Sequence, residues 1–122
     1  DLIVISSDNH HTMNNTNTTT VSQLTNGSTV EMLSLLTGAQ IVFDDNKNII
    51  NLHFPKMVGK AGKKFKTLSV QYNAGTDSYD LKGYKLNTRT FEVEYKLQEE
   101  NVYCDQLKGF CEQLTGLYFS MR

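Results

Sequence analysis

The sequence predicts a single α+β domain: an antiparallel meander sheet of four to five strands, with a short N-terminal and a longer C-terminal helix packed on one face. Three observations predict this fold. The chain has 122 residues, the size of one domain. Apolar and polar residues alternate with a period of two through its middle, and both flanks carry apolar residues at helical spacing. The loops between the strands are short, which requires antiparallel neighbours.

The first 28 residues differ from the rest. Residues 2–5 are a short apolar, β-prone run, and residues 6–20 are almost wholly polar and rich in Asn and Thr. Such a stretch has too little apolar area to offset the entropy lost on ordering it. We therefore expect residues 1–28 to form a polar tail or linker and residues 29–122 to form the domain.

The short helix is expected at about residues 29–37. Ser28 as N-cap and Glu31 reaching back to it fit a capping box. Gly38 fits the left-handed residue that often follows the last turn of a helix. The apolar residues at helical spacing are Val30, Leu33 and Leu36.

The strands are expected within residues 39–43, 50–54, 68–72, 79–86 and 91–97. Pro55 should stop the second of them, because proline cannot donate to a ladder. Gly83 marks a bulge or bend. The last run alternates most cleanly, with Phe91, Val93, Tyr95 and Leu97 on its apolar side.

The longer helix begins near Asn101, a candidate N-cap, carries Asp105 in its first turn, and ends at Gly116. Cys104, Leu107, Cys111 and Leu114 form its apolar stripe. Seven residues of helix separate the two cysteines by about 10.5 Å, beyond the reach of about 7 Å of a disulfide. Two unpaired thiols favour a reducing compartment, so we expect the cytoplasm.

The composition excludes a strong electrostatic field over the whole molecule. The chain has 12 basic and 13 acidic residues, a net charge of −1, so any attraction to nucleic acid must come from a local patch. No apolar run reaches the roughly 18–20 residues of a membrane helix, and no membrane partner is expected. The sequence leaves the oligomeric state open, a dimer included.

The one local patch is a lysine loop expected over residues 56–66, with glycines that keep its backbone flexible. Its basic residues are Lys56, Lys60, Lys63, Lys64 and Lys66. Clustered lysines bind phosphates, and this binding releases condensed counterions. The spacing of the glycines and lysines does not match a P-loop. The alternative is a solvated hairpin loop that keeps a sheet edge soluble.

Three further groups have ordinary structural explanations beside their functional ones. Asp8, His10 and His11 follow a strand-like run, as in the first metal motif of calcineurin-like metallophosphoesterases, but the later motifs of that family are missing. Tyr72, Tyr79 and Tyr95 could stack bases, yet alternation places them on the apolar side. Two carboxylate pairs also have structural explanations: Asp77 and Asp80 bracket a turn, and Glu92 and Glu94 share a solvated strand face. Neither these carboxylates nor the two thiols indicate catalysis. No metal or cofactor is expected.

A resemblance gives the function some direction. The segments 70–73, 77–81 and 101–107, with the Leu-Thr-Gly-Leu of residues 114–117, resemble a set of short uncharacterised proteins carried by phages, plasmids and integrated elements. The resemblance covers residues 65–118 and implies a mobile-element accessory protein inside a bacterial cell.

The sequence therefore favours a non-enzymatic binding protein that acts on a host protein or nucleic acid, for example against host defence. The lysine loop and the strand face of Glu92, Glu94 and Lys96 are its candidate contact surfaces. Two alternatives remain: a metal-dependent hydrolase that uses Asp8 and the two adjacent histidines, and a structural component of a virion.

Overall fold

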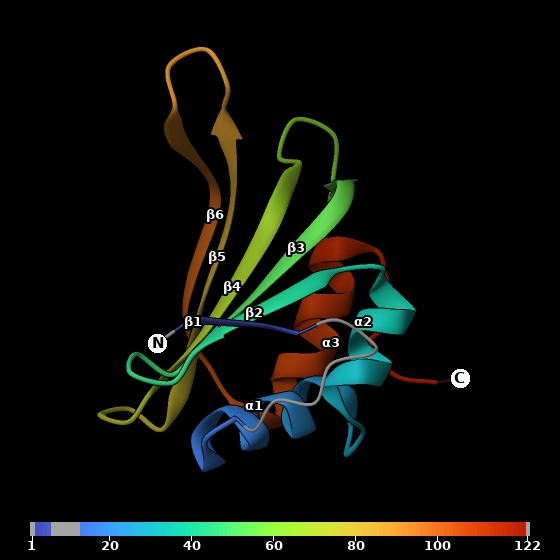
Figure 1. Cartoon of the computed structure of the whole chain (residues 1–122), viewed down its shortest axis with the longest axis vertical. Coiled ribbons are helices and arrows are strands. Elements are labelled where there is room, and N and C mark those ends of the chain that lie inside the picture. The colour runs from blue at the N-terminus through green and yellow to red at the C-terminus, as the bar shows by residue number, and fades with distance from the viewer. Residues whose placement is uncertain (1, 6–12, 122) are drawn as a thin grey trace.

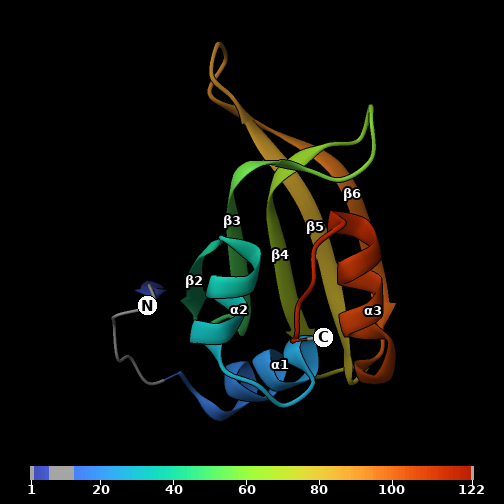
Figure 2. The same ribbon diagram turned by 90° about the vertical axis from the view of Figure 1, so that its right-hand side faces the viewer.

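The computed structural model describes residues 2–5 and 13–121, and its α+β fold confirms the predicted class. One antiparallel sheet has the strand order β1-β2-β3-β4-β5-β6 (Figure 1). The three described helices lie on one face of this sheet, and no described helix covers the other face, which we call the open face (Figure 2). Within the described residues, no helix is long and apolar enough to cross a membrane.

Hairpin loops of four to six residues join the last five strands. These are β2 (Gln40–Asp44), β3 (Ile49–Val58), β4 (Phe65–Asn73), β5 (Ser78–Asn87) and β6 (Glu92–Val102). Strand β1 (Leu2–Ile5) pairs antiparallel with β2 at the sheet's edge. The sheet therefore has six described strands instead of the predicted four to five, because the β-prone run at residues 2–5 joins it.

The expectation that Pro55 ends its strand is wrong. Strand β3 continues through Pro55 to Val58. The pairing of β3 with β4 shifts register between His53 and Val58, where Pro55 lies. A residue without an N–H is tolerated at such an irregularity, since no ladder bond is lost there.

Helix α1 (Asn15–Thr25) corrects the expectation of a tail up to residue 28. Asn14 caps this helix by accepting a hydrogen bond from the Asn17 N–H at 2.7 Å. The Asn14 side chain also donates to Asn48 Oδ1 at 3.0 Å and to the Asp45 carbonyl at 3.1 Å. The polar composition predicted a tail because polar side chains are usually exposed. In α1 a polar side chain can be buried when it is hydrogen-bonded, as the Thr25 hydroxyl is to the Val21 carbonyl at 2.7 Å.

Helix α2 (Val30–Thr37) lies where a short helix was predicted, and Gly38 ends it in the left-handed region at φ 73°. Its N-cap is Thr29, whose hydroxyl accepts from the Met32 N–H at 3.1 Å, and not Ser28 as predicted. The Ser28 N–H donates instead to the Thr25 hydroxyl, which links α2 to the end of α1.

Helix α3 (Cys104–Thr115) closes the fold, with Asp105 in its first turn and Gly116 as C-cap, as predicted. It begins after Tyr103 and not at Asn101, because β6 continues to Val102. Helices and sheet enclose one core, whose largest fully buried side chains are Phe43, Phe65, Phe119, Leu24, Leu33, Ile41, Ile50, Leu52, Leu68, Leu81 and Leu107.

Candidate functional site

The five predicted lysines lie around the β3–β4 hairpin. Lys56 belongs to β3 and Lys66 to β4, so the loop itself spans only residues 59–64 and carries the other three. All five side chains are exposed. The loop is therefore shorter than predicted, and its lysines are available to a partner.

The lysine loop has a defined shape. The Lys63 N–H donates to the Lys60 carbonyl at 2.9 Å, which closes a turn with Gly62 at φ 83°. Gly59, at φ 106°, packs so closely that an added Cβ would lie 3.3 Å from the Phe65 ring and 3.4 Å from the Leu114 carbonyl. The loop is thus held against the last turn of α3, with two positions that favour glycine.

A 320 Å³ cavity lies beneath this loop, between it, β6 and α3. Lys60 and Lys63 line it from the loop, and Lys96 lines it from β6. The other lining residues are Phe65, Leu97, Gln98, Glu99 and Leu114. Three cationic side chains and one carboxylate thus surround a partly apolar floor, and we call this cavity the lysine pocket.

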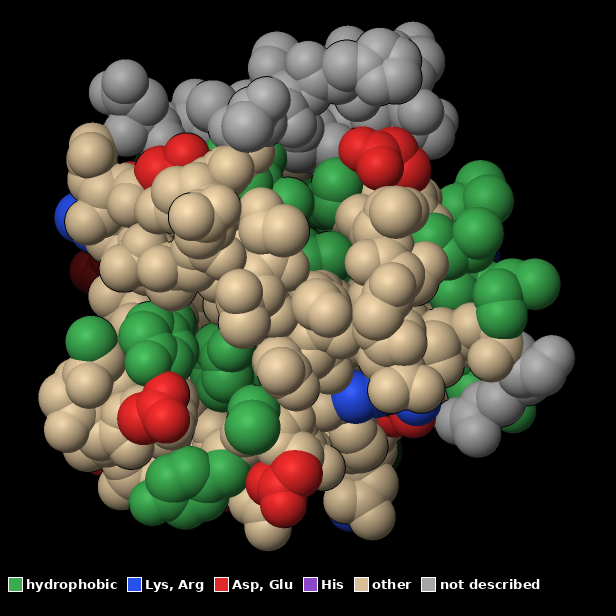
Figure 3. Space-filling view, turned by 90° about the horizontal axis from the view of Figure 1, so that it is seen from below, with side chains coloured by type: hydrophobic (Ala, Val, Ile, Leu, Met, Phe, Trp, Pro, Cys, Tyr) green, Lys and Arg blue, Asp and Glu red, His purple; other side chains and the backbone are tan. Residues whose placement is uncertain are grey.

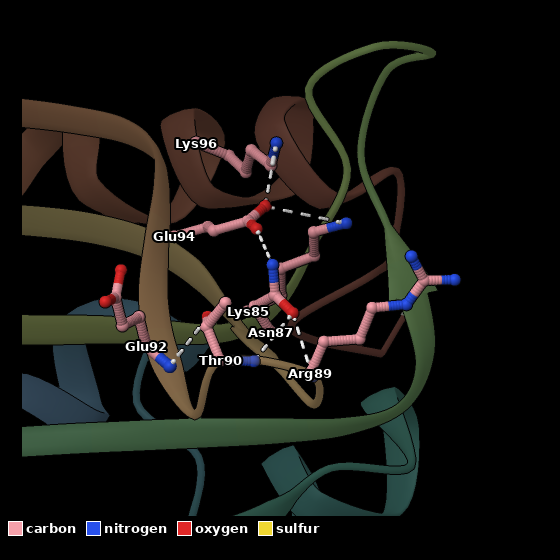
Figure 4. A network of polar contacts seen from close by, with 7 residues as sticks. All are labelled: Lys85, Asn87, Arg89, Thr90, Glu92, Glu94 and Lys96. Carbon is pink, nitrogen blue, oxygen red and sulfur yellow. Dashed lines mark hydrogen bonds and ion pairs between the residues drawn. The ribbon is translucent and has the colours of Figure 1, made fainter.

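Lys96 also belongs to a network on β5 and β6 (Figure 4). The carboxylate of Glu94 lies 3.5 Å from Lys96 Nζ and 3.8 Å from Lys85 Nζ, and it accepts from Asn87 Nδ2 at 2.8 Å. The hydrogen bond from Asn87, followed by the two lysines, holds the pKa of Glu94 below its ordinary value. Glu94 therefore remains anionic and positions Lys85 and Lys96.

The meander separates charge along the molecule. The β3–β4 and β5–β6 hairpins point to the same end (Figures 1 and 2), and their segments 56–66 and 85–96 carry eight basic and two acidic residues. At the opposite end, segments 44–47, 77–80 and 101–105 carry five acidic residues and one lysine. Seen from that end, the surface over α1 is mostly neutral and polar, with few basic side chains (Figure 3). We call residues 56–66 and 85–96 the cationic end.

The tyrosines divide between the two faces of the sheet. Tyr79 is buried, and Tyr72 is half-buried with its hydroxyl donating to Asp77 Oδ1 at 2.7 Å, a hydrogen bond that raises its pKa. Tyr95 is 52% exposed and stacks edge-on against Tyr84 at 5.7 Å on the open face. The interpretation of Tyr95 as a core or helix-packing tyrosine is therefore wrong.

A second cavity, of 310 Å³, lies between α1 and the β4–β5 turn. Its walls include Tyr72, Asp77, Tyr79 and Cys104, with neutral polar side chains of α1. The only carboxylate among its lining residues accepts the Tyr72 hydrogen bond. None of the described residues that line this cavity is a cation, so it is less suited to a phosphate than the lysine pocket.

The thiols are both free, as predicted from their spacing. Cys111 is buried, which raises the pKa of its thiol, whereas Cys104 is exposed and does not belong to the buried stripe. His53 is half-buried on the open face, where its Nδ1 lies 2.8 Å from the Thr67 hydroxyl. Burial lowers the pKa of His53 and favours its neutral form.

The metal motif predicted at Asp8, His10 and His11 lies outside the described residues. Among residues 2–5 and 13–121, no three His, Cys, Asp or Glu side chains are grouped to hold a metal ion. The sequence located the loop lysines but did not join them to Lys96, which comes from a strand 32 residues further along the chain than Lys64.

Comparison with known proteins adds no relative: no family model, no curated protein and no solved structure matches the chain.

Proposed function

We propose that this chain is a small non-enzymatic binding protein whose cationic end binds nucleic acid through its phosphates. One observation carries the proposal: Lys60 and Lys63 of the β3–β4 loop and Lys96 of β6 line the same cavity. Two segments far apart in sequence thus contribute lysines to the wall of one cavity. The remaining basic residues of the cationic end extend this surface to a length of backbone.

The physical basis is local charge. A protein that neutralises phosphates with lysine releases condensed counterions, and its affinity falls steeply as salt rises. A net charge of −1 does not oppose this, because the cationic end carries eight basic and two acidic residues, whereas the segments at the opposite end carry five acidic residues and one lysine. Phosphate contacts by lysine position a protein without reading bases, so we expect weak sequence preference.

The resemblance of residues 65–118 to mobile-element proteins indicates where such a protein would act. Such a protein would act in the cytoplasm of a bacterial host cell, on host nucleic acid or on a host protein. The segregation of eight basic residues at one end favours nucleic acid, because a phosphate backbone presents a regular row of anions.

Fluorescence anisotropy with a labelled duplex of 20 base pairs, at several salt concentrations, tests the proposal. The variant Lys60→Gln/Lys63→Gln should bind more weakly, with its log–log salt slope reduced by about 2, since each lost phosphate contact contributes about 0.9. Lys47→Gln/Lys108→Gln changes the net charge equally, away from the lysine pocket, and should keep the parent slope. Equal loss in both variants, or no binding by the parent protein, would refute the proposal.

A further inference from the structure

Beyond the helices, β5 and β6 continue as a two-stranded arm (Figures 1 and 2). The two sides of this arm differ. One side carries the polar network of Lys85, Asn87, Glu94 and Lys96 (Figure 4). That side is therefore polar, and its lysines belong to the cationic end.

The other side of the arm is apolar and exposed. Leu86 pairs with Val93 and Tyr84 pairs with Tyr95 across the strands, so all four side chains share the open face of the sheet. Leu86 is 54% exposed, Val93 46% and Tyr95 52%. A contiguous apolar stripe of this kind on a protein surface commonly marks a binding site.

Phe91, at the tip of the arm, is 79% exposed. The loop that presents it is ordered by hydrogen bonds: Asn87 Oδ1 accepts from the Arg89 N–H at 2.9 Å, and the Phe91 N–H donates to the Asn87 carbonyl at 2.7 Å. Phe91 has a φ of 59°, a conformation rare for a bulky residue. The fold thus holds a large aromatic side chain out in water on a shaped loop.

The charges around Phe91 identify what covers it. Arg89 lies two residues before it and extends from the loop on the side opposite Glu92 (Figure 4). The cationic end continues from this loop to the lysine pocket, and Lys82 lies 5.9 Å from the centre of the Tyr95 ring on the open face. Exposed aromatic rings beside basic side chains suit a polyanion that itself carries flat aromatic groups.

We propose that the arm binds single-stranded nucleic acid, with Phe91 stacking on an unpaired base while the basic residues of the cationic end hold the backbone. This inference rests on the proposed function and adds the class of nucleic acid. In a duplex the faces of the bases are covered by their neighbours, so Phe91 has nothing to stack on. The protein therefore prefers a single strand over a duplex of the same length.

Replacements of Phe91 test the stacking. The chain contains no tryptophan, so Phe91→Trp introduces a single indole that reports on its own environment. Binding of a 20-nucleotide thymidine oligonucleotide should quench this fluorescence at parent affinity, since indole stacks at least as well as a phenyl ring. Phe91→Asn, which tolerates the left-handed backbone, should lose affinity for the single strand by about fivefold to 150-fold and keep its affinity for the duplex.

Leu35→Asn is the matched control, because Leu35 is 70% exposed on α2 and far along the chain from the arm. It should leave both affinities unchanged. Equal single-strand affinity of Phe91→Asn and the parent would overturn the inference while leaving the phosphate-binding function intact. Loss of all binding in Lys60→Gln/Lys63→Gln with no effect of Phe91→Asn has the same meaning. An indole spectrum that responds to phosphatidylserine vesicles and not to the oligonucleotide would assign the arm to a lipid surface and also overturn it.

Discussion

Replacing Gly83 by alanine should destabilise the protein, because the added methyl group has no room. A Cβ on Gly83 would lie 2.8 Å from Leu97 Cδ2 and 2.9 Å from Phe65 Cγ. Leu97 is partly buried and can yield, but Phe65 is only 1% exposed and packs in the core. The strain therefore falls on the floor of the lysine pocket and on the bulge from which the arm starts.

The expected change in the free energy of unfolding follows from two opposing contributions. Overpacking a well-packed core costs about 1–3 kcal/mol, and the lower entropy of the unfolded chain returns about 0.4–1 kcal/mol. The net loss for Gly83→Ala is about 1–2 kcal/mol. With an unfolding entropy of about 2.1 cal/mol/K per residue, 122 residues convert this loss into a fall in Tm of about 4–8 °C.

Gly109→Ala is the matched control for calorimetry and urea unfolding. Gly109 lies inside α3, and a Cβ there would meet nothing within 4 Å. Alanine should stabilise the helix by about 1 kcal/mol, raising Tm by about 4 °C. The same substitution should thus act with opposite sign at two glycines. A Gly83→Ala protein at least as stable as the parent would refute the packing argument.

Three other results are expected. Asn14→Ala removes the cap of α1 and its two bonds to the β2–β3 turn, so urea unfolding should show a loss of about 1–2 kcal/mol; an unchanged midpoint would mean that α1 is not anchored there. Because the folded pKa of His53 lies below its unfolded value, the unfolded state binds the proton more readily, and stability should fall as pH drops below about 6.5. His53→Gln should flatten that dependence in thermal melts, and an unaltered profile would assign it to other groups. Ellman's reagent should label Cys104 rapidly in the native protein and Cys111 only after unfolding; two fast thiols would contradict the burial of Cys111.

Sequence periodicity predicted the sheet and two of the helices because those elements bury apolar side chains at regular spacing. Helix α1 escaped prediction because its buried face includes Asn17 and Thr20, which composition counts as solvent-exposed. The Asn17 amide donates to Asp45 Oδ1, 28 residues further along the chain, and no local pattern shows this partner. A polar helix that is anchored by hydrogen bonds to a distant turn therefore looks like a linker in the sequence.

The bulge in β6 explains why the sequence did not predict which β6 side chains lie at the candidate site. Gly83 pairs with Leu97 and Tyr84 with Tyr95, so Lys96 is the extra residue between two pairs. An inserted residue reverses which side chains face each side of the sheet. Strict alternation placed Tyr95 beside Leu97, whereas the bulge sends Leu97 to the lysine pocket and Tyr95 to the open face. Gly83 indicated a bulge, but the partner of each β6 residue follows only from the folded register.

The topology also explains how a nearly neutral chain can have a cationic end. In an antiparallel meander alternate turns fall at opposite ends, so charge placed on every second turn gathers at one end without changing the total. Under the proposed function, the cationic hairpins would attract an approaching polyanion and the acidic segments at the opposite end would repel it, which would orient the encounter before contact. Net charge therefore says little about local charge in this protein, whereas the placement of its turns decides where its basic and acidic side chains gather.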